Sequence, residues 1–150
     1  MLAKLKAIGP EFATTLVGEV FYREFANRRK LGSYVGLGSS PFCSGPVDRD
    51  QGISKAGNRR ARRMLVECSW SYQHPPRVGQ AKQAKVDAAS PLVREIAWKA
   101  QCRLYRRYRT LIRNGKLRTV AIVAIARELA GFIWAVARAV TTAPVVATPA

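Results

Sequence analysis

The strongest constraint on the fold is a pair of long helical patterns in the last third of the chain, separated by an Asn-Gly pair. Residues 91–113 carry apolar side chains at helical spacing on one face and arginine or lysine over most of the rest. Residues 117–140 are rich in alanine and valine and apolar nearly all round, which is typical of a helix enclosed by others. Asn114-Gly115 is a favourable end for the first helix. The sequence therefore predicts a mainly α, compact helical domain with residues 117–140 at its centre.

Shorter helices are predicted upstream from residues that suit helix ends. Pro10 opens the first of them, because proline is favoured in a first helical turn. Asn27 can cap a helix over 28–35 and Asn58 a helix over about 58–72, since asparagine side chains accept hydrogen bonds from free backbone N–H groups. The first and third of these segments also carry apolar stripes at helical spacing.

Three other segments are expected to lack helix. Residues 36–57 are rich in glycine, serine and proline, and we expect a long loop or a short hairpin between the second and third helices. Residues 77–88 are polar and mixed, which favours a loop or a frayed turn. Residues 141–150 are expected to form a disordered tail after a single domain over 1–140.

The loop contains the candidate nucleophile. Ser44 lies between Cys43 and a Gly-Pro pair, and a dense arginine run follows the loop. A serine beside guanidinium groups could attack a phosphodiester that those groups hold, forming a phosphoserine intermediate. Ser54 is the alternative nucleophile, with hydrogen bonding of the turn as its simpler role. Cys43 is a chemical rival, although no histidine flanks it.

The charge of the chain points to an anionic partner. With 26 Lys and Arg against 9 Asp and Glu, the formal net charge is +17, an excess that folding does not require. Nucleic acid is the partner that this charge favours, and a solvated basic surface is the alternative. The residues expected to contact nucleic acid are Arg28, Arg29, Lys30, Lys55, Asn58, Arg59, Arg60, Arg63, Arg103, Arg106 and Arg107.

Other functional classes find little support in the sequence. The three cysteines are far apart and have no CxxC spacing, which argues against a zinc site or a disulfide framework. The nine acidic residues form no recognisable paired site, so we expect no metal site and no cofactor in this chain. Arg127 and Glu128 interrupt the most apolar segment, so a membrane span is not expected.

The loop and its flanks resemble a known family. "SYVGL" followed by "SGPVDRDQGISKAGNRRARRMLVE", with "AIGPEFATTLVGEV" before it and "NGKLRTVAIVAIARELAGFIWAVAR" after it, is similar to the C-terminal domain of the insertion-sequence 110/116/902 transposases, which are serine recombinases guided by a bridge RNA. The resemblance implies that Ser44, in its Ser-Gly pair, attacks DNA and forms a 5′-phosphoserine link. It also implies DNA and guide RNA as partners.

The same resemblance implies a domain that this chain lacks. Family members carry an N-terminal RuvC-like domain whose acidic residues bind Mg²⁺. The chain resembles the C-terminal half, beginning with a partial helix-hairpin-helix in which residues 6–9 read Lys-Ala-Ile-Gly where the family usually has Pro-Gly-Ile-Gly. We therefore expect a cytoplasmic, nucleoid-associated transposase fragment that needs an N-terminal half, or a homo-oligomer, to act. The alternative is a catalytically inactive remnant that binds nucleic acid.

Overall fold

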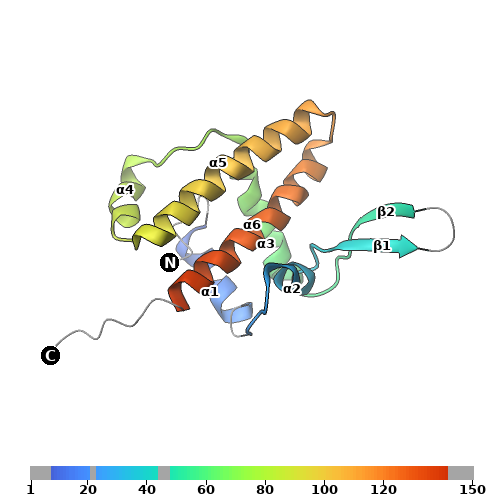
Figure 1. Ribbon diagram of the computed structural model, residues 1–150, viewed down its shortest axis with the longest axis horizontal. Coiled ribbons are helices and arrows are strands. Elements are labelled where there is room, and N and C mark those ends of the chain that lie inside the picture. Colours follow the sequence, from blue (N-terminus) through green and yellow to red (C-terminus); the bar gives the residue numbers. More distant parts are fainter. Residues whose placement is uncertain (1–7, 21–22, 44–47, 142–150) are drawn as a thin grey trace.

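The computed structural model describes residues 8–20, 23–43 and 48–141, and its described part is mainly helical (Figure 1). Its elements in chain order are α1 (Pro10–Glu19), α2 (Arg28–Tyr34), β1 (Ser39–Cys43), β2 (Asp48–Ile53), α3 (Arg59–Ser69), the 3-10 helix η2 (Trp70–Gln73), α4 (Gln80–Asp87), α5 (Pro91–Arg113) and α6 (Arg118–Thr141). The mainly α fold class, with a hairpin between the second and third helices, is confirmed.

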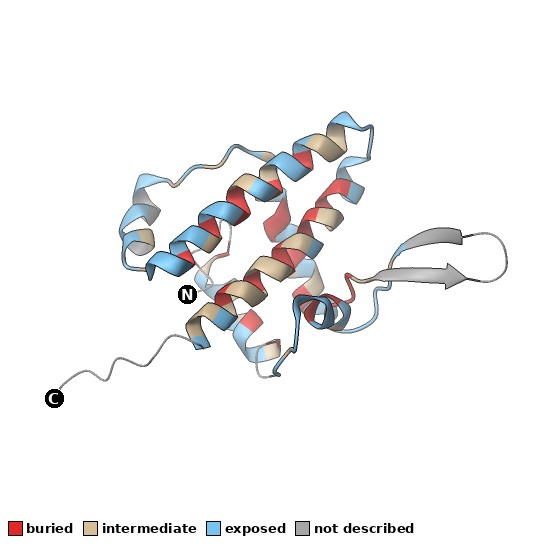
Figure 2. Cartoon of the chain, in the orientation of Figure 1, coloured by how far each residue is buried: buried red, intermediate tan, exposed pale blue. Residues whose placement is uncertain are grey.

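Helix α6 forms the centre of the bundle, as its composition predicts. It runs antiparallel to α5 and packs also against α2 and α3 (Figure 1). Figure 2 shows buried residues along α6 and along the face of α5 that meets it. The buried residues of α6 are Ala121, Ile122, Ile125, Ala126, Leu129, Ala130, Ile133 and Val136.

The turn between α5 and α6 is fixed by local backbone chemistry. Gly115 has a φ of 74°, a conformation that glycine adopts at little cost. The Gly115 N–H donates to the Ile112 carbonyl (3.0 Å) and the Lys116 N–H donates to the Leu111 carbonyl (3.1 Å). These two bonds satisfy carbonyl groups that the end of α5 would otherwise leave unpaired. The helix stop expected at Asn114-Gly115 is therefore confirmed.

The helix starts expected from side-chain caps are also confirmed. Asn27 Oδ1 accepts from the N–H groups of Arg29 and Lys30, each at 3.0 Å. Asn58 Oδ1 accepts from the Ala61 N–H at 2.9 Å. Such side chains satisfy donors that the first turn of a helix cannot pair internally.

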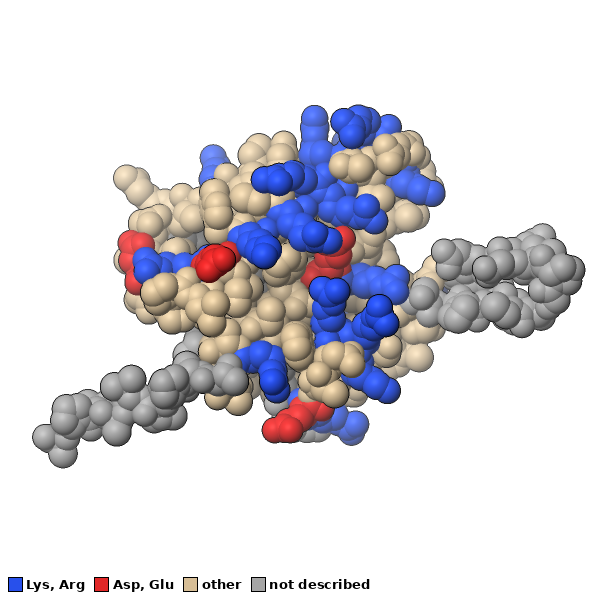
Figure 3. All heavy atoms as spheres, viewed as in Figure 1, with Lys and Arg blue, Asp and Glu red and all other residues tan. Residues whose placement is uncertain are grey.

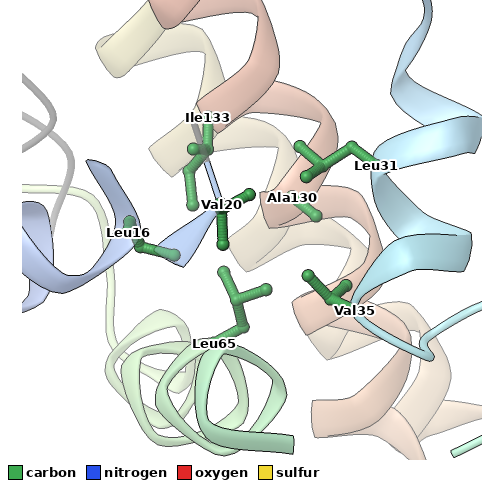
Figure 4. A pocket seen from close by; sticks show the side chains of 7 residues that line it. All are labelled: Leu16, Val20, Leu31, Val35, Leu65, Ala130 and Ile133. Carbon is green, nitrogen blue, oxygen red and sulfur yellow. The ribbon is translucent and has the colours of Figure 1, made fainter. Parts of the chain in front are cut away.

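Four helices meet at a tightly packed apolar junction. Figure 4 shows side chains of α1, α2, α3 and α6, and of the residues that directly follow α1 and α2, converging on one point. They line a cavity of about 10 Å³. Leu65 of α3 points into this junction and is 2 % exposed. The lining side chains are Leu16, Val20, Leu31, Val35, Leu65, Ala130 and Ile133. A void of this size with apolar walls is expected to stay dry.

The segment before α2 is tied to α6 by an aromatic group. Trp134 Nε1 donates to the Phe25 carbonyl at 3.0 Å, and the Phe25 and Tyr34 rings lie 5.3 Å apart, centroid to centroid. A tryptophan that is partly buried commonly satisfies its N–H in this way. Trp134 is partly buried and packs against the core.

One secondary-structure expectation is wrong. Within 77–88, which we expected to be a loop or frayed turn, α4 spans Gln80–Asp87. Its residues are alanine, glutamine and lysine for the most part, all good helix formers. Gln83 Nε2 adds a hydrogen bond to Asp87 Oδ1 at 3.0 Å, one turn along. Without an apolar stripe, intrinsic propensity was the only available sign of this helix.

The antiparallel strands β1 and β2 form a hairpin that projects from the helical body (Figure 1). Its register pairs Pro41 with Asp50 and Cys43 with Asp48, and a register shift lies between Ser39 and Pro41. Residues 44–47, which connect the strands, lie outside the described residues. So do the first part of the expected helix-hairpin-helix, over 1–7, and the tail after Thr141.

Helix α6 is long and apolar enough, by length and composition alone, to cross a membrane; the mean hydropathy of its most apolar 18-residue window is 1.9. The same test is passed by the core helix of a globular domain. Here α6 packs against α2, α3 and α5, which is the arrangement expected of a core helix.

Candidate nucleic-acid interface

The base of the hairpin is fastened to the helical body by backbone hydrogen bonds. The Ser54 N–H donates to the Gly38 carbonyl (2.9 Å) and the Lys55 N–H donates to the Gly36 carbonyl (3.1 Å). The Asn58 N–H donates to the Tyr34 carbonyl at 3.0 Å. The two ends of the loop are therefore held against each other at the point where α2 ends and α3 begins.

Two glycines make this close approach possible. A Cβ at Gly36 would lie 1.9 Å from the Ala56 carbonyl oxygen, and one at Gly57 would lie 2.0 Å from the Tyr34 carbonyl oxygen. Both residues also have positive φ, 71° and 90°. Only a residue without Cβ fits either position without moving the backbone.

Arg62 braces the same junction. Its Nη1 donates to the Val35 carbonyl at 3.0 Å and to the Ala56 carbonyl at 3.4 Å. It thereby satisfies a carbonyl at the end of α2 and one in the loop. The sequence shows Arg62 only as a member of the arginine run, so this structural role was not visible from it.

Glu19, at the end of α1, interacts with two of the residues predicted to contact nucleic acid. Asn58 Nδ2 donates to Glu19 Oε2 at 3.3 Å, and Arg60 Nη1 lies 2.9 Å from Glu19 Oε1. Because Asn58 Oδ1 also caps α3, both the oxygen and the nitrogen of its side-chain amide are already hydrogen-bonded within the fold. Arg60 remains 71 % exposed, so its guanidinium can still contact another anion.

The other predicted residues near the loop are exposed. Arg59 makes no ion pair within the described part of the chain, whereas Arg63 pairs with Glu67 at 2.8 Å, one turn along α3. Lys55 is exposed and has a φ of 56°. Cys43 ends β1, and Ser54 follows β2 and is exposed. Ser44, the candidate nucleophile, lies outside the described residues.

On α5 the predicted arginines meet an acidic residue of α6. Arg103 Nε lies 2.9 Å and Arg107 Nε 3.5 Å from the Glu128 carboxylate. Arg106 is exposed and has no ion pair among the described residues. No sequence pattern indicates a partner for Glu128, since the pairing depends on how α5 packs against α6.

The α5 arginines and the first turn of α2 lie around one stripe of α6. The Cδ of Arg28 would lie 3.5 Å from a Cβ placed on Gly131, so the Arg28 stem rests on α6 at this point. Gly131 and Glu128 are three residues apart and therefore share a face of α6. Figure 3 shows the Lys and Arg side chains gathered along α5 and over the base of the hairpin, with few acidic groups between them.

We name this surface the basic band. Its members are the exposed cations of the two helix segments that contact this stripe, which are Arg28, Arg29 and Lys30 of α2 and Arg103, Arg106 and Arg107 of α5. The Arg103 side chain is 64 % exposed, although that of Glu128 is only 26 % exposed, and ion pairs open to solvent on one side contribute on the order of 1 kcal/mol. Both α5 arginines can therefore exchange the carboxylate for phosphate oxygens at little cost. The band is a surface suited to a polyanion.

Within the described residues there is no group of three or more His, Cys, Asp or Glu that could hold a metal ion. The Mg²⁺ implied by the resemblance therefore finds no fitting ligand set in this part of the chain. No chemical step through Mg²⁺ follows from these residues.

The buried Cys68 thiol makes the stability of the fold sensitive to alkaline pH. Burial, and secondarily the charge of Glu67, raise the pKa of Cys68 from 9.0 to about 11. In the unfolded chain the thiol ionises near pH 9, so above that pH the unfolded state binds fewer protons than the native state. The free energy of unfolding is expected to fall between pH 8 and 10, by at most about 1.4 kcal/mol per pH unit from this group.

Urea unfolding of the wild type and of Cys68→Ala at pH 8 and pH 10 measures this effect. Cys68→Ala is expected to show the smaller fall. Tyr72, whose pKa burial also raises, has an ordinary pKa of 10.0 and contributes mainly above this window. Equal falls in the two proteins would rule out Cys68 as the cause.

The fold and its surface define a class of protein: a small, basic helical domain with an anchored hairpin. The family described as "Transposase IS116/IS110/IS902 family" matches residues 1–83, more than half of the chain. The chain belongs to this transposase family, as its loop and flanks indicate.

Two curated relatives agree with this assignment. The chain is 51% identical over 114 residues to a Sinorhizobium fredii protein named "Putative transposase y4qE", covering 76% of this chain and 29% of the relative. It is 51% identical over 77 residues to "Putative transposase y4rJ" of the same organism, covering 51% of this chain and 19% of the relative. The chain thus spans less than a third of either relative. No solved structure matches it.

Proposed function

We propose that this chain is the part of a transposase that binds nucleic acid and carries the serine nucleophile for DNA transposition. Family membership supports the transposase assignment. The observation that carries the binding role is the basic band, which consists of exposed cations on the segments of α2 and α5 that contact one stripe of α6. DNA and a guide RNA are the proposed partners, and the proposed location is the cytoplasm, at the nucleoid.

The basic band would hold the phosphate backbone. Guanidinium groups bind phosphate oxygens in pairs and stay charged at any physiological pH. Arg59, Arg60 and Lys55 extend the positive surface toward the hairpin base, with Arg60 sharing its charge with Glu19. Nucleic acid bound along α5 and α2 would therefore pass close to the loop that carries the candidate serine.

The proposed chemistry is attack by Ser44 on a DNA phosphodiester. A bond forms between Ser44 Oγ and phosphorus, the bond from phosphorus to O3′ breaks, and the serine keeps the 5′-phosphate while a 3′-hydroxyl departs. Ser44 directly follows β1, whose base is fastened to the helical body by the bonds of Ser54 and Lys55. Ser54 is the alternative nucleophile.

A covalent-trapping assay tests the chemistry. The chain is incubated with Mg²⁺, element-end DNA, guide RNA and a separately expressed N-terminal half from a relative, and then run on a denaturing gel. The wild type and Ser54→Ala are expected to give a DNA-shifted band, and Ser44→Ala to give none. Loss of the band only in Ser54→Ala would assign the nucleophile to Ser54.

The same preparation tests the alternative, a catalytically inactive remnant that binds nucleic acid. That alternative expects no covalent band, binding that weakens steeply with added salt, and no effect of Ser44→Ala on affinity. Absence of both the band and the salt-sensitive binding would contradict the proposed function in either form. Gel filtration with and without the N-terminal half shows whether a homo-oligomer forms.

A further inference from the structure

We infer that a hollow at the turn between α5 and α6 binds an unpaired nucleotide of a nucleic-acid strand. The hollow has a volume of about 440 Å³, which lies within the range of small-ligand sites in proteins. It is lined by Gln73 and His74 at the end of η2, by Tyr108, Arg109, Thr110, Ile112 and Arg113 of α5, and by Arg118 at the start of α6. The inference rests on the proposed binding of nucleic acid and specifies a second place where the strand is held.

Three arginines give the hollow its affinity for phosphate. Arg109, Arg113 and Arg118 are exposed, and none of them forms an ion pair within the described residues. Among the described residues, none that lines the hollow is acidic. Three positive charges around one open space repel one another, and a bound phosphate would relieve that repulsion. Arginine forks are also well shaped for phosphate oxygens.

The remaining walls suit a base. Tyr108 is 6 % exposed and Ile112 is partly buried, so the inner wall is apolar and fixed by the core. Gln73 and Thr110 add polar groups; the Thr110 hydroxyl donates to the Arg106 carbonyl at 3.0 Å, which leaves its oxygen able to accept. A flat apolar group with polar edges fits this lining, and an unstacked base is such a group. In a duplex the bases are stacked and cannot enter, so the hollow selects for unpaired strand.

The hollow adjoins the basic band. Arg106, a member of the band, is three residues before Arg109 and seven before Arg113, so the three lie along one side of α5. A strand whose phosphates follow the band would reach the hollow without leaving α5. The band therefore serves duplex and single strand alike, whereas the hollow is specific to unpaired nucleotides.

Fluorescence anisotropy with two labelled probes tests this division. One probe is an oligothymidylate of about 15 nucleotides, a length that matches known single-strand binding sites. The other probe is a duplex of the same length. The hollow variant is Arg109→Gln with Arg113→Gln. The matched control is Arg28→Gln with Arg29→Gln, which removes the same charge from the basic band.

The hollow variant is expected to weaken single-strand binding about tenfold and duplex binding by no more than about threefold, whereas the control weakens both to similar extents. Equal losses on both probes in the hollow variant would overturn the inference and reduce the hollow to general positive charge. Unchanged single-strand binding would overturn it too. Wild-type protein that binds neither probe would overturn the proposed function as well, so the two failures are distinguishable.

Two additions keep the test decisive. Thermal melting by circular dichroism checks folding; if the double variant unfolds, Arg118→Gln replaces it, because loss of a positive charge from the first turn of α6 does not destabilise that helix.

Competition separates the contribution of the base from that of the phosphate: thymidine monophosphate is expected to displace the oligothymidylate better than inorganic phosphate at equal ionic strength. Equal displacement would show phosphate capture alone and overturn the assignment of a base site.

Discussion

Gly57→Ala is expected to lower the free energy of unfolding by about 3 to 5 kcal/mol, from the strain of a positive φ and a backbone clash together. The new Cβ would lie 2.0 Å from the Tyr34 carbonyl oxygen and 2.9 Å from the Tyr34 carbonyl carbon. The atoms it meets are backbone, so α2 or the start of α3 must move. That movement would break the Asn58 N–H to Tyr34 hydrogen bond and separate the two ends of the hairpin base. Urea unfolding followed by circular dichroism measures the loss.

Gly115→Ala is the matched control for this substitution. Gly115 also has a positive φ, 74°, but a Cβ there would meet nothing within 4 Å. It is expected to cost only the strain of the left-handed conformation, about 1 to 2 kcal/mol. If Gly57→Ala costs no more than Gly115→Ala, the close approach of α2 to the hairpin base is not present in solution.

Leu65→Ala is expected to destabilise the fold by about 3 to 5 kcal/mol. The Leu65 side chain is 2 % exposed and fills the junction of α1, α2, α3 and α6 (Figure 4). Removing it loses the burial free energy of the leucine and enlarges the existing cavity, which the surrounding helices can only partly close. Thermal and urea unfolding of the full chain provide the measurement.

Leu117→Ala provides the comparison for Leu65, since Leu117 is 73 % exposed. Its cost is expected to stay within about 0.5 kcal/mol, as for most surface positions. A comparable loss from both variants would argue that Leu117 is covered in solution. A small loss from Leu65→Ala would show that the four-helix junction is loosely packed.

Gly57→Ala and Leu65→Ala are expected to affect function differently. Leu65→Ala weakens the helical body but leaves the geometry of the hairpin base intact in the molecules that remain folded. Gly57→Ala alters the segment that joins the hairpin to the body, close to Arg59 and Arg60. In the covalent-trapping assay, Gly57→Ala is therefore expected to lose more product than its loss of folded protein explains.

The helix ends were predictable because they depend on residues close together in sequence. Asn27 and Asn58 cap the helices that follow them, and Asn114-Gly115 ends α5. Each cap involves a side chain or a glycine within a few residues of the groups it satisfies. The apolar stripes of α3 and α5 face the core for the same reason, since their period is that of the helix.

The roles of individual charged residues were not predictable. In the sequence, Arg62 is one member of an arginine run. It donates hydrogen bonds to the Val35 and Ala56 carbonyls only because the start of α3 packs beside the end of α2. Glu19 and Asn58 are 39 residues apart and meet because α1 ends beside the start of α3. Arg103 and Arg107 meet Glu128 only through the packing of α5 on α6.

The sequence by itself determined the helical class, the helix ends at strong caps, the central place of α6 and the transposase family, because periodicity, capping and family motifs are local properties of the chain. Tertiary structure alone decided which cations form ion pairs and how the basic band forms across α6. It also decided that a hollow lined by three arginines opens beside η2. These features depend on contacts between segments far apart in sequence. Their geometry follows from how side chains of several helices fill one core, and no local pattern encodes that packing.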